Sequence, residues 1–181
     1  MKLKMRFRYS LICSVAALVL SAQAADTQKA SDAQTHGPSV ADQALTSSLA
    51  RYMVPLYELM KPGEKRYDAG FARQLRRLVA PQLAKNPNFL ARLTSGPTAP
   101  GTYLVTGQHG YVYYGICQAH QCDNTTMELL FDPIRNRMVG KLLDSCKPYW
   151  LGQPDNAEIG LLDQHHRANF PATVTTCMGE K

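Results

Sequence analysis

The chain has 181 residues, of which 45% are hydrophobic and 19% charged, and its formal net charge is +6. The first 24 positions hold four basic residues and no acids, so the other 157 residues (181 − 24) carry 16 basic residues (20 − 4) against 14 acids, a net charge of +2. That length fits one domain with its own core, and the low charge excludes the basic surface that nucleic-acid binding requires.

The first 24 residues have the pattern of a secretory signal peptide. A basic stretch at residues 2–8 precedes an apolar run from Leu11 to Leu20. Ala22-Gln23-Ala24 then forms a small-x-small cleavage site, so we expect the mature chain to begin at Ala25. An uncleaved anchor is the alternative, but the apolar run is shorter than the roughly 20 residues that a membrane span needs. No later stretch is better suited, so we expect no membrane span in the mature protein.

The first half of the mature chain is predicted to be helical after a flexible start. Residues 25–38 contain almost no large apolar side chains and cannot bury enough surface to order themselves. The domain, residues 39–181, then begins with a helical apolar pattern that Pro55 should end or kink. Asp68 is placed as the N-cap of a second helix. The apolar face of that helix holds Phe71, Leu75, Leu78 and Val79, and one more short helical piece is expected at residues 88–93.

From Gly101 onward the pattern changes to short β-branched and aromatic runs separated by turn residues, which predicts strands. Because short turns join neighbouring runs, we expect them to pair antiparallel in chain order. A last helix should start at Pro154 and end near the pair His165-His166. The predicted strands cover residues 102–106, 111–114, 125–132, 137–143 and 148–151.

These elements predict the α+β fold class, with a single antiparallel β-sheet of about five strands in a meander and helices packed on one face. Tyr111, Tyr113 and Trp150 could belong to the core or to an interface, and alternation along the strands favours the core.

Four cysteines remain after the leader, namely Cys117, Cys122, Cys146 and Cys177, and an even count in an exported chain indicates disulfides. Three pairings are possible. We favour Cys117–Cys122 and Cys146–Cys177, because the first two residues are already close in sequence. The chain-entropy model gives about 2 kcal/mol for the short loop and about 3.5 kcal/mol for the long one. The long bridge should therefore stabilise the fold, while the short one mainly shapes a loop.

The segment between Cys117 and Cys122 holds His120 and lies between two predicted strands. A zinc site would offer only two thiolates and one imidazole within six residues, whereas structural sites use four ligands. A catalytic Cys–His pair would need a free thiol of low pKa, which a neighbouring cysteine argues against. Two readings remain: a disulfide-closed loop that presents His120 to a partner, and a stapled hairpin whose histidine has no function.

Residues 113–122, Tyr-Tyr-Gly-Ile-Cys-Gln-Ala-His-Gln-Cys, resemble the signature of the Ivy family, the periplasmic inhibitors of vertebrate (C-type) lysozyme. That family carries Cys-Lys-Pro-His-Asp-Cys at the corresponding place. The resemblance spans roughly Leu45 to Leu162 and is strongest from Tyr111 to Leu151. Further matching residues are Leu45 to Ala50, Phe71, Leu130-Phe131-Asp132, Asn136, Met138, Gly140 and Tyr149-Trp150-Leu151.

The resemblance implies a periplasmic inhibitor that is not an enzyme, uses no cofactor or metal, and is a possible homodimer. Its partner would be a C-type lysozyme, whose cleft receives the inhibitory loop while His120 meets the two catalytic carboxylates. A regulator of endogenous lytic transglycosylases is a second possible role within the family. A periplasmic metal-binding module, using Cys117, His120 and Cys122 with help from His165 and His166, is the alternative from another class. The inhibitory loop consists of Cys117, Gln118, Ala119, His120, Gln121 and Cys122.

Three loop residues depart from the family pattern, since Gln118, Ala119 and Gln121 replace its Lys, Pro and Asp. Losing the proline frees one φ angle and losing the aspartate removes an acceptor, so we expect a looser loop. C-type lysozymes are generally basic, and a net charge of +2 would not attract one. Local acids are expected to do so instead, at Asp123, Glu128 and Asp132.

Overall fold

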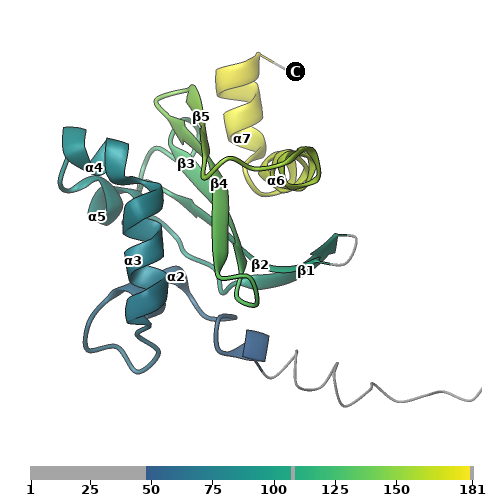
Figure 1. Cartoon of the computed structure of the whole chain (residues 1–181). Helices are drawn as coiled ribbons and strands as arrows, with labels where there is room; N and C mark the ends of the chain where they lie inside the picture. The colour runs from purple at the N-terminus through teal and green to yellow at the C-terminus, as the bar shows by residue number, and fades with distance from the viewer. Residues whose placement is uncertain (1–47, 107–108, 180–181) are drawn as a thin grey trace, which may run out of the picture. The chain divides into compact units, whose positions relative to one another are not determined.

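Five antiparallel strands form one sheet, in the order β1-β2-β3-β4-β5, so each strand pairs with its neighbour in the chain (Figure 1). This confirms the predicted class and the meander. The strands begin and end within about two residues of the predicted limits, except that β2 is longer at both ends. They are β1 (Thr102–Thr106), β2 (His109–Cys117), β3 (Thr126–Asp132), β4 (Arg137–Asp144) and β5 (Lys147–Leu151).

The computed structural model describes residues 48–106 and 109–179. The predicted signal peptide, the predicted flexible segment at residues 25–38 and the start of the helix expected from Ser39 lie outside this range. Residues 48–50 form a helical turn before Pro55, as the pattern predicted. None of the described helices combines the length and the apolar character needed to cross a bilayer.

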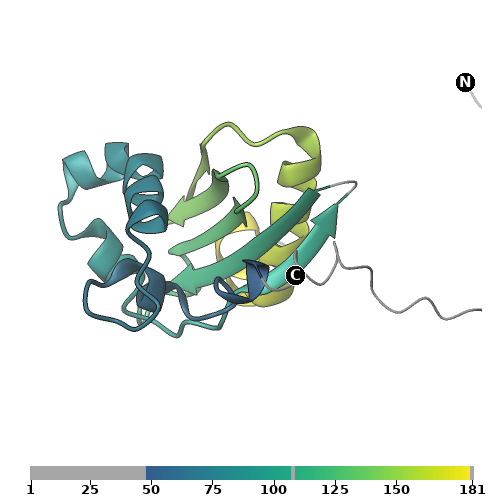
Figure 2. The ribbon, with the colours of Figure 1, turned by 60° about the horizontal axis from the view of Figure 1, so that its bottom comes forward.

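Four short helices cover one face of the sheet. Val112, Tyr114 and Ile116 of β2 point to this face and are buried against Leu56, Phe71 and Leu75. In Figure 2 these helices lie to the left of the strands. They are α2 (Leu56–Met60), α3 (Ala69–Leu78), α4 (Ala80–Lys85) and α5 (Phe89–Leu93).

A further helix, α6 (Asn156–Asn169), covers the opposite face, so the expectation that helices pack on one face was wrong (Figure 1). Tyr111, Tyr113 and Leu130 point to this face and pack with Leu162 of α6. The physical reason lies in the central strands, because every residue of β3 is buried. A strand whose side chains are buried on both sides needs a cover on both sides.

Local capping explains where two helices begin. Asp68 caps α3, as predicted, by accepting hydrogen bonds from the backbone N–H groups of Gly70 and Phe71 at 2.8 and 3.0 Å. For α6 the prediction was wrong: the helix starts after Asp155, whose carboxylate accepts from the Glu158 N–H at 2.8 Å in a capping box. Because the capping box makes Asp155 the N-cap, Pro154 lies outside the helix. Beyond α6, the chain ends in α7 (Pro171–Thr173) and a π-helical turn, η1 (Val174–Met178).

Candidate functional site

The loop that joins β2 to β3 carries the residues singled out by the sequence. A disulfide joins Cys117 to Cys122, with the two Cα atoms 5.0 Å apart, and this is one of the two predicted pairings. Inside the ring, the backbone N–H of Gln121 donates to the carbonyl of Gln118 at 3.0 Å and closes a β-turn. His120 occupies that turn and its side chain is exposed. The segment is therefore a closed loop that presents an imidazole to solvent.

His120 has a left-handed backbone conformation, with φ of +61°. Few residues other than glycine adopt this conformation, but histidine, asparagine and aspartate do so several times more often than the rest. The turn and the disulfide both hold the chain at this point. The covalent ring and the flanking strands therefore set the direction of the His120 Cα–Cβ bond.

The incoming half of the loop rests against the segment that precedes β1. Ser95 Oγ accepts a hydrogen bond from the backbone N–H of Ala119 at 3.2 Å, and Thr98 forms an isolated antiparallel bridge with Ile116. Gly96 lies so close that an added Cβ would come within 2.4 Å of the Cys117 carbonyl oxygen. Only glycine fits there. No pattern in the sequence indicated this contact between residues 95–98 and the loop.

The outgoing half of the loop is held by two other parts of the chain. Thr173 donates a hydrogen bond from its hydroxyl to the carbonyl of Cys122 at 2.9 Å. The backbone N–H of Cys146, in the turn between β4 and β5, donates to the Asn124 carbonyl at 2.9 Å. Cys146 is in turn disulfide-bonded to Cys177, the second predicted pairing. These contacts support the loop from outside the disulfide ring, and the looser loop expected from the replaced residues stays a prediction.

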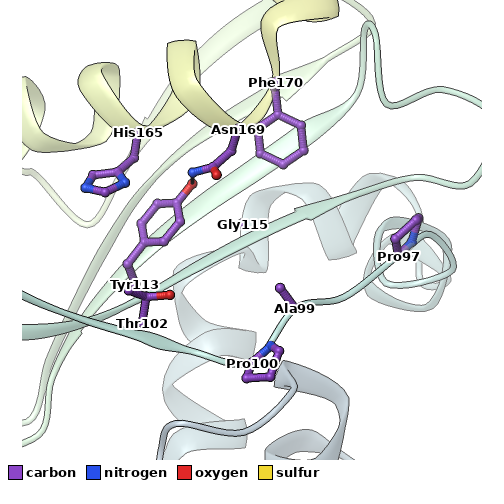
Figure 3. Close-up of a pocket in the computed structure, with 9 residues that line it drawn as sticks. All are labelled: Pro97, Ala99, Pro100, Thr102, Tyr113, Gly115, His165, Asn169 and Phe170. Atoms are coloured by element: carbon purple, nitrogen blue, oxygen red, sulfur yellow. Dashed lines mark hydrogen bonds between the residues drawn. The ribbon is translucent and has the colours of Figure 1, made fainter.

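A cavity of about 380 Å³ lies near the base of the loop, between the C-terminal end of α6 and the strand β1 (Figure 3). Tyr113 and Gly115 of β2 form part of its wall, and Asn169 donates a hydrogen bond to the Tyr113 hydroxyl at 3.2 Å. Partial burial lowers the pKa of His165, and burial raises the pKa of Tyr113. Both groups are therefore neutral near pH 7. The other lining residues are Pro97, Ala99, Pro100, Thr102 and Phe170.

The two adjacent histidines of α6 have separate surroundings. His165 lines the cavity, with its ring 4.7 Å from the ring of Tyr113. His166 is fully buried, and its Nδ1 lies 2.8 Å from Oε1 of Glu128, which is also fully buried. The helix ends near this pair, as expected: α6 continues to Asn169, and His166 lies in its last turn. No sequence signal indicated the buried pair, since the partners are 38 positions apart.

Burial also corrects two expectations about surface groups. Glu128 and Asp132 are 0% and 2% exposed, so neither acts as a surface charge for a basic partner. Asp132 instead accepts from Arg135 Nε at 2.5 Å. Of the three acids named, only Asp123 keeps partial exposure. Tyr111 and Tyr113 are in the core as expected, but Trp150 is 45% exposed because it lies on the edge strand β5, beside Lys141.

The metal-binding alternative requires thiolates at Cys117 and Cys122, whereas the structure joins their sulfur atoms. Within residues 48–106 and 109–179, no three or more His, Cys, Asp or Glu side chains group closely enough to hold a metal ion. His165 and His166 add nothing to such a site, because His166 is enclosed with Glu128.

The fold and the loop together define a class of small disulfide-bonded α+β domain whose exposed feature is a closed loop. Comparison with known families adds the identity: the family model described as "Inhibitor of vertebrate lysozyme (Ivy)" matches residues 70–180, more than half of the chain. The chain belongs to the Ivy family. A search of curated proteins found no match, and a search of solved structures found none either. Members of this family are lysozyme inhibitors, and the family assignment places this chain among them.

Proposed function

We propose that this protein inhibits C-type lysozyme by inserting the loop from Cys117 to Cys122 into the glycosidase cleft. There His120 hydrogen-bonds to the two catalytic carboxyl groups and blocks them. The observation that supports this most is the exposed His120 in a left-handed turn inside a disulfide ring. An exported chain would meet such an enzyme in the periplasm, where disulfides form. The proposal therefore includes cleavage of a signal peptide after about Ala24.

The chemistry of the target explains why an imidazole suits it. A glycosidase keeps one carboxyl group protonated as its acid and the other ionised. One imidazole ring can donate a hydrogen bond to the ionised carboxylate and make a second hydrogen bond to its partner. It then fills the space of the scissile glycosidic bond. The inhibitor thus blocks lysozyme by binding alone, and the proposal assigns it no enzymatic activity.

The closed loop also explains how affinity arises from a small contact. Binding costs free energy for every side chain and loop that becomes ordered. Residues 117–125 are already held by a disulfide and by hydrogen bonds from three other segments. Little further order is required on binding, so more of the contact energy contributes to affinity.

The test is a titration of lysozyme activity with wild-type protein and single variants. His120→Asn keeps a residue that tolerates a left-handed backbone but removes the imidazole, and we expect inhibition to weaken at least roughly 10-fold, because buried central contacts dominate interfaces. His120→Ala should weaken it as well. Gln118→Ala, in the same loop, is the matched control and should have a smaller effect.

Thermal unfolding of each variant shows whether the domain is intact, and the melting temperature of His120→Asn should stay near that of the wild type because the side chain is exposed. An unchanged titration for the His120 variants would rule out the insertion mechanism. The same titration against a lytic transglycosylase shows whether endogenous enzymes are a second target.

A further inference from the structure

The last residues of the chain return to the inhibitory loop. After α6 ends, the ring of Phe170 lies against Gly115 of β2, where an added Cβ would approach that ring to 3.2 Å. Three residues later Thr173 is fully buried, and its hydroxyl donates to the Cys122 carbonyl at 2.9 Å. We call residues 170–177 the C-terminal tail. The tail thus lies behind the loop and contacts one of its two disulfide-bonded residues.

A second element holds the same stretch of the loop. The turn between β4 and β5 has positive φ at both Ser145 and Cys146, +52° and +64°. The Cys146 N–H donates to the Asn124 carbonyl at 2.9 Å, and the Ser145 N–H donates to Thr125 Oγ1 at 3.3 Å. We define the outgoing half of the loop as residues 122–125, which lead into β3. The tail binds the Cys122 carbonyl, and this turn binds the Asn124 carbonyl and the Thr125 hydroxyl.

The Cys146–Cys177 disulfide ties these two holding elements together. The tail consists of Phe170, α7 and the turn η1 as far as Cys177. A covalent bond to the β4–β5 turn fixes Cys177, which lies four residues beyond Thr173. The bond thereby keeps the Thr173 hydroxyl near the loop carbonyl.

We propose that the C-terminal tail is a working part of the inhibitory site, in which Thr173 is a positioning residue for the loop and the Cys146–Cys177 disulfide holds Thr173 in place. The inference rests on the proposed function, because it assigns to the tail the task of keeping His120 in its binding geometry. Thr173 acts through the backbone of Cys122 and does not touch the lysozyme. Losing this support releases the outgoing half of the loop while the sheet and its two cores remain.

Position 173 allows a matched pair of variants. Thr173→Val has nearly the same shape without the hydroxyl, and Thr173→Ser keeps the hydroxyl with less bulk. A hydrogen bond of this kind contributes about 0.5–1.5 kcal/mol, so we expect Thr173→Val to weaken lysozyme inhibition roughly 3- to 10-fold. Thr173→Ser should restore most of the wild-type value. Thr175→Val is the control, because the Thr175 hydroxyl bonds only within the tail, to the Pro171 carbonyl.

Hydrogen exchange on the free protein separates positioning from general stability. In Thr173→Val we expect faster exchange at the Gln121 and Thr125 amides, which bond inside the loop, and unchanged exchange in the centre of β3. The double variant Cys146→Ala/Cys177→Ala also lowers global stability, so we expect its loop amides to be accelerated by a larger factor than the amides in the centre of β3. A general loss of stability would accelerate hydrogen exchange in the loop and in the strand by similar factors.

Two outcomes would overturn the inference: inhibition by Thr173→Val equal to that of the wild type, or loop amides that exchange at the wild-type rate in both tail variants. The exchange measurement needs no lysozyme. If the wild-type protein itself failed to inhibit lysozyme, the proposed function would fail, whereas the exchange rates would still decide whether the tail holds the loop.

Discussion

The side chain of Glu128 is enclosed between the sheet and helix α6. Its Oε1 lies 2.8 Å from His166 Nδ1, and both side chains are fully buried. Lys141 on β4 is a further positive group near it, but Lys141 pairs with Asp163 at 2.7 Å. Among the described residues, Oε2 of Glu128 finds no hydrogen-bond donor. Burial therefore raises the pKa of Glu128, and the hydrogen bond with His166, together with the electrostatic effect of His166 and Lys141, offsets only part of this increase.

This pKa direction fixes how stability depends on pH. A carboxyl whose pKa is higher in the folded state contributes stability that is complete below its unfolded pKa, about 4.3, and that is lost as the pH rises through the folded pKa. We expect Glu128→Gln to gain stability relative to the wild type between pH 4 and pH 7, by about 1.4 kcal/mol for each unit by which the pKa is raised.

Urea unfolding of both proteins at several pH values measures the difference. Glu64→Gln changes a surface carboxyl paired with Lys61 and is the control. A difference between Glu128→Gln and the wild type that stays flat across this pH range would contradict the assignment.

At the scale of single elements, α3 illustrates how a cap positions a core helix. Asp68 accepts from two backbone N–H groups, pairs with Arg51, and lies 3.3 Å from the Tyr52 hydroxyl. Partial burial alone would raise the pKa of Asp68, but the Phe71 hydrogen bond, the Arg51 charge and the other hydrogen bonds together lower it. The helix that starts here brings Phe71 into ring contact with Tyr114 and Phe131.

Asp68→Ala should lower the free energy of unfolding at neutral pH by about 1 kcal/mol, whereas Asp68→Asn, which retains a capping oxygen, should cost less. The stability that comes from the lowered pKa is present above the unfolded pKa of about 3.9 and is lost as the pH falls through the folded pKa. The gap between the wild type and Asp68→Asn should therefore narrow in acid. Denaturant melts at pH 7 and pH 3 check both statements, and a gap that widened in acid would be inconsistent with this cap.

Elements differ in how far the sequence could predict them. Asp68 and the apolar residues of α3 follow the local rules of helix capping and periodicity, so α3 was found. The strands were found because β-branched and aromatic runs alternate with turn residues. Helix α6 buries Glu158 and His166, so its buried face is partly polar and has no hydrophobic period to indicate which surface it covers. Arg137 makes the burial of Glu158 possible by donating to it at 2.6 Å, a contact between residues 21 positions apart.

The loop itself shows the same division between local and distant information. The ring from Cys117 to Cys122 and its histidine are a local pattern, and a family resemblance added their meaning. The supports of that ring come from Ser95, Gly96 and Thr173, which are far from it in sequence. Only the Cys146–Cys177 pairing hinted that the chain end returns to the sheet. Distances of this kind depend on the tertiary fold and leave no period or motif in the sequence.

At the scale of the whole molecule, one disulfide should contribute more to stability and the other more to inhibition. Removing Cys146–Cys177 by paired serine substitutions opens a loop with a sequence separation of 31 and should cost about 3.5 kcal/mol of stability. Removing Cys117–Cys122 opens one with a separation of 5 and should cost about 2 kcal/mol. We expect the second variant to inhibit lysozyme less well than the first, because its ring carries His120.

Chemical unfolding and lysozyme titration of the same two double variants provide both rankings. A mild reductant should likewise reduce inhibition by the wild-type protein before it unfolds the domain. If inhibition followed the order of stability, the loop disulfide would have no role of its own.

The contact between the C-terminal tail and the loop sets an order of assembly. Cys117 and Cys122 are five positions apart, so their disulfide can form as soon as both have reached an oxidising compartment. Thr173 follows Cys122 by 51 positions and Cys177 follows Cys146 by 31, so their contacts can form only later. A copy truncated before Phe170 would then keep all five strands but lack the tail, and we expect full inhibition only when residues 170–177 are present.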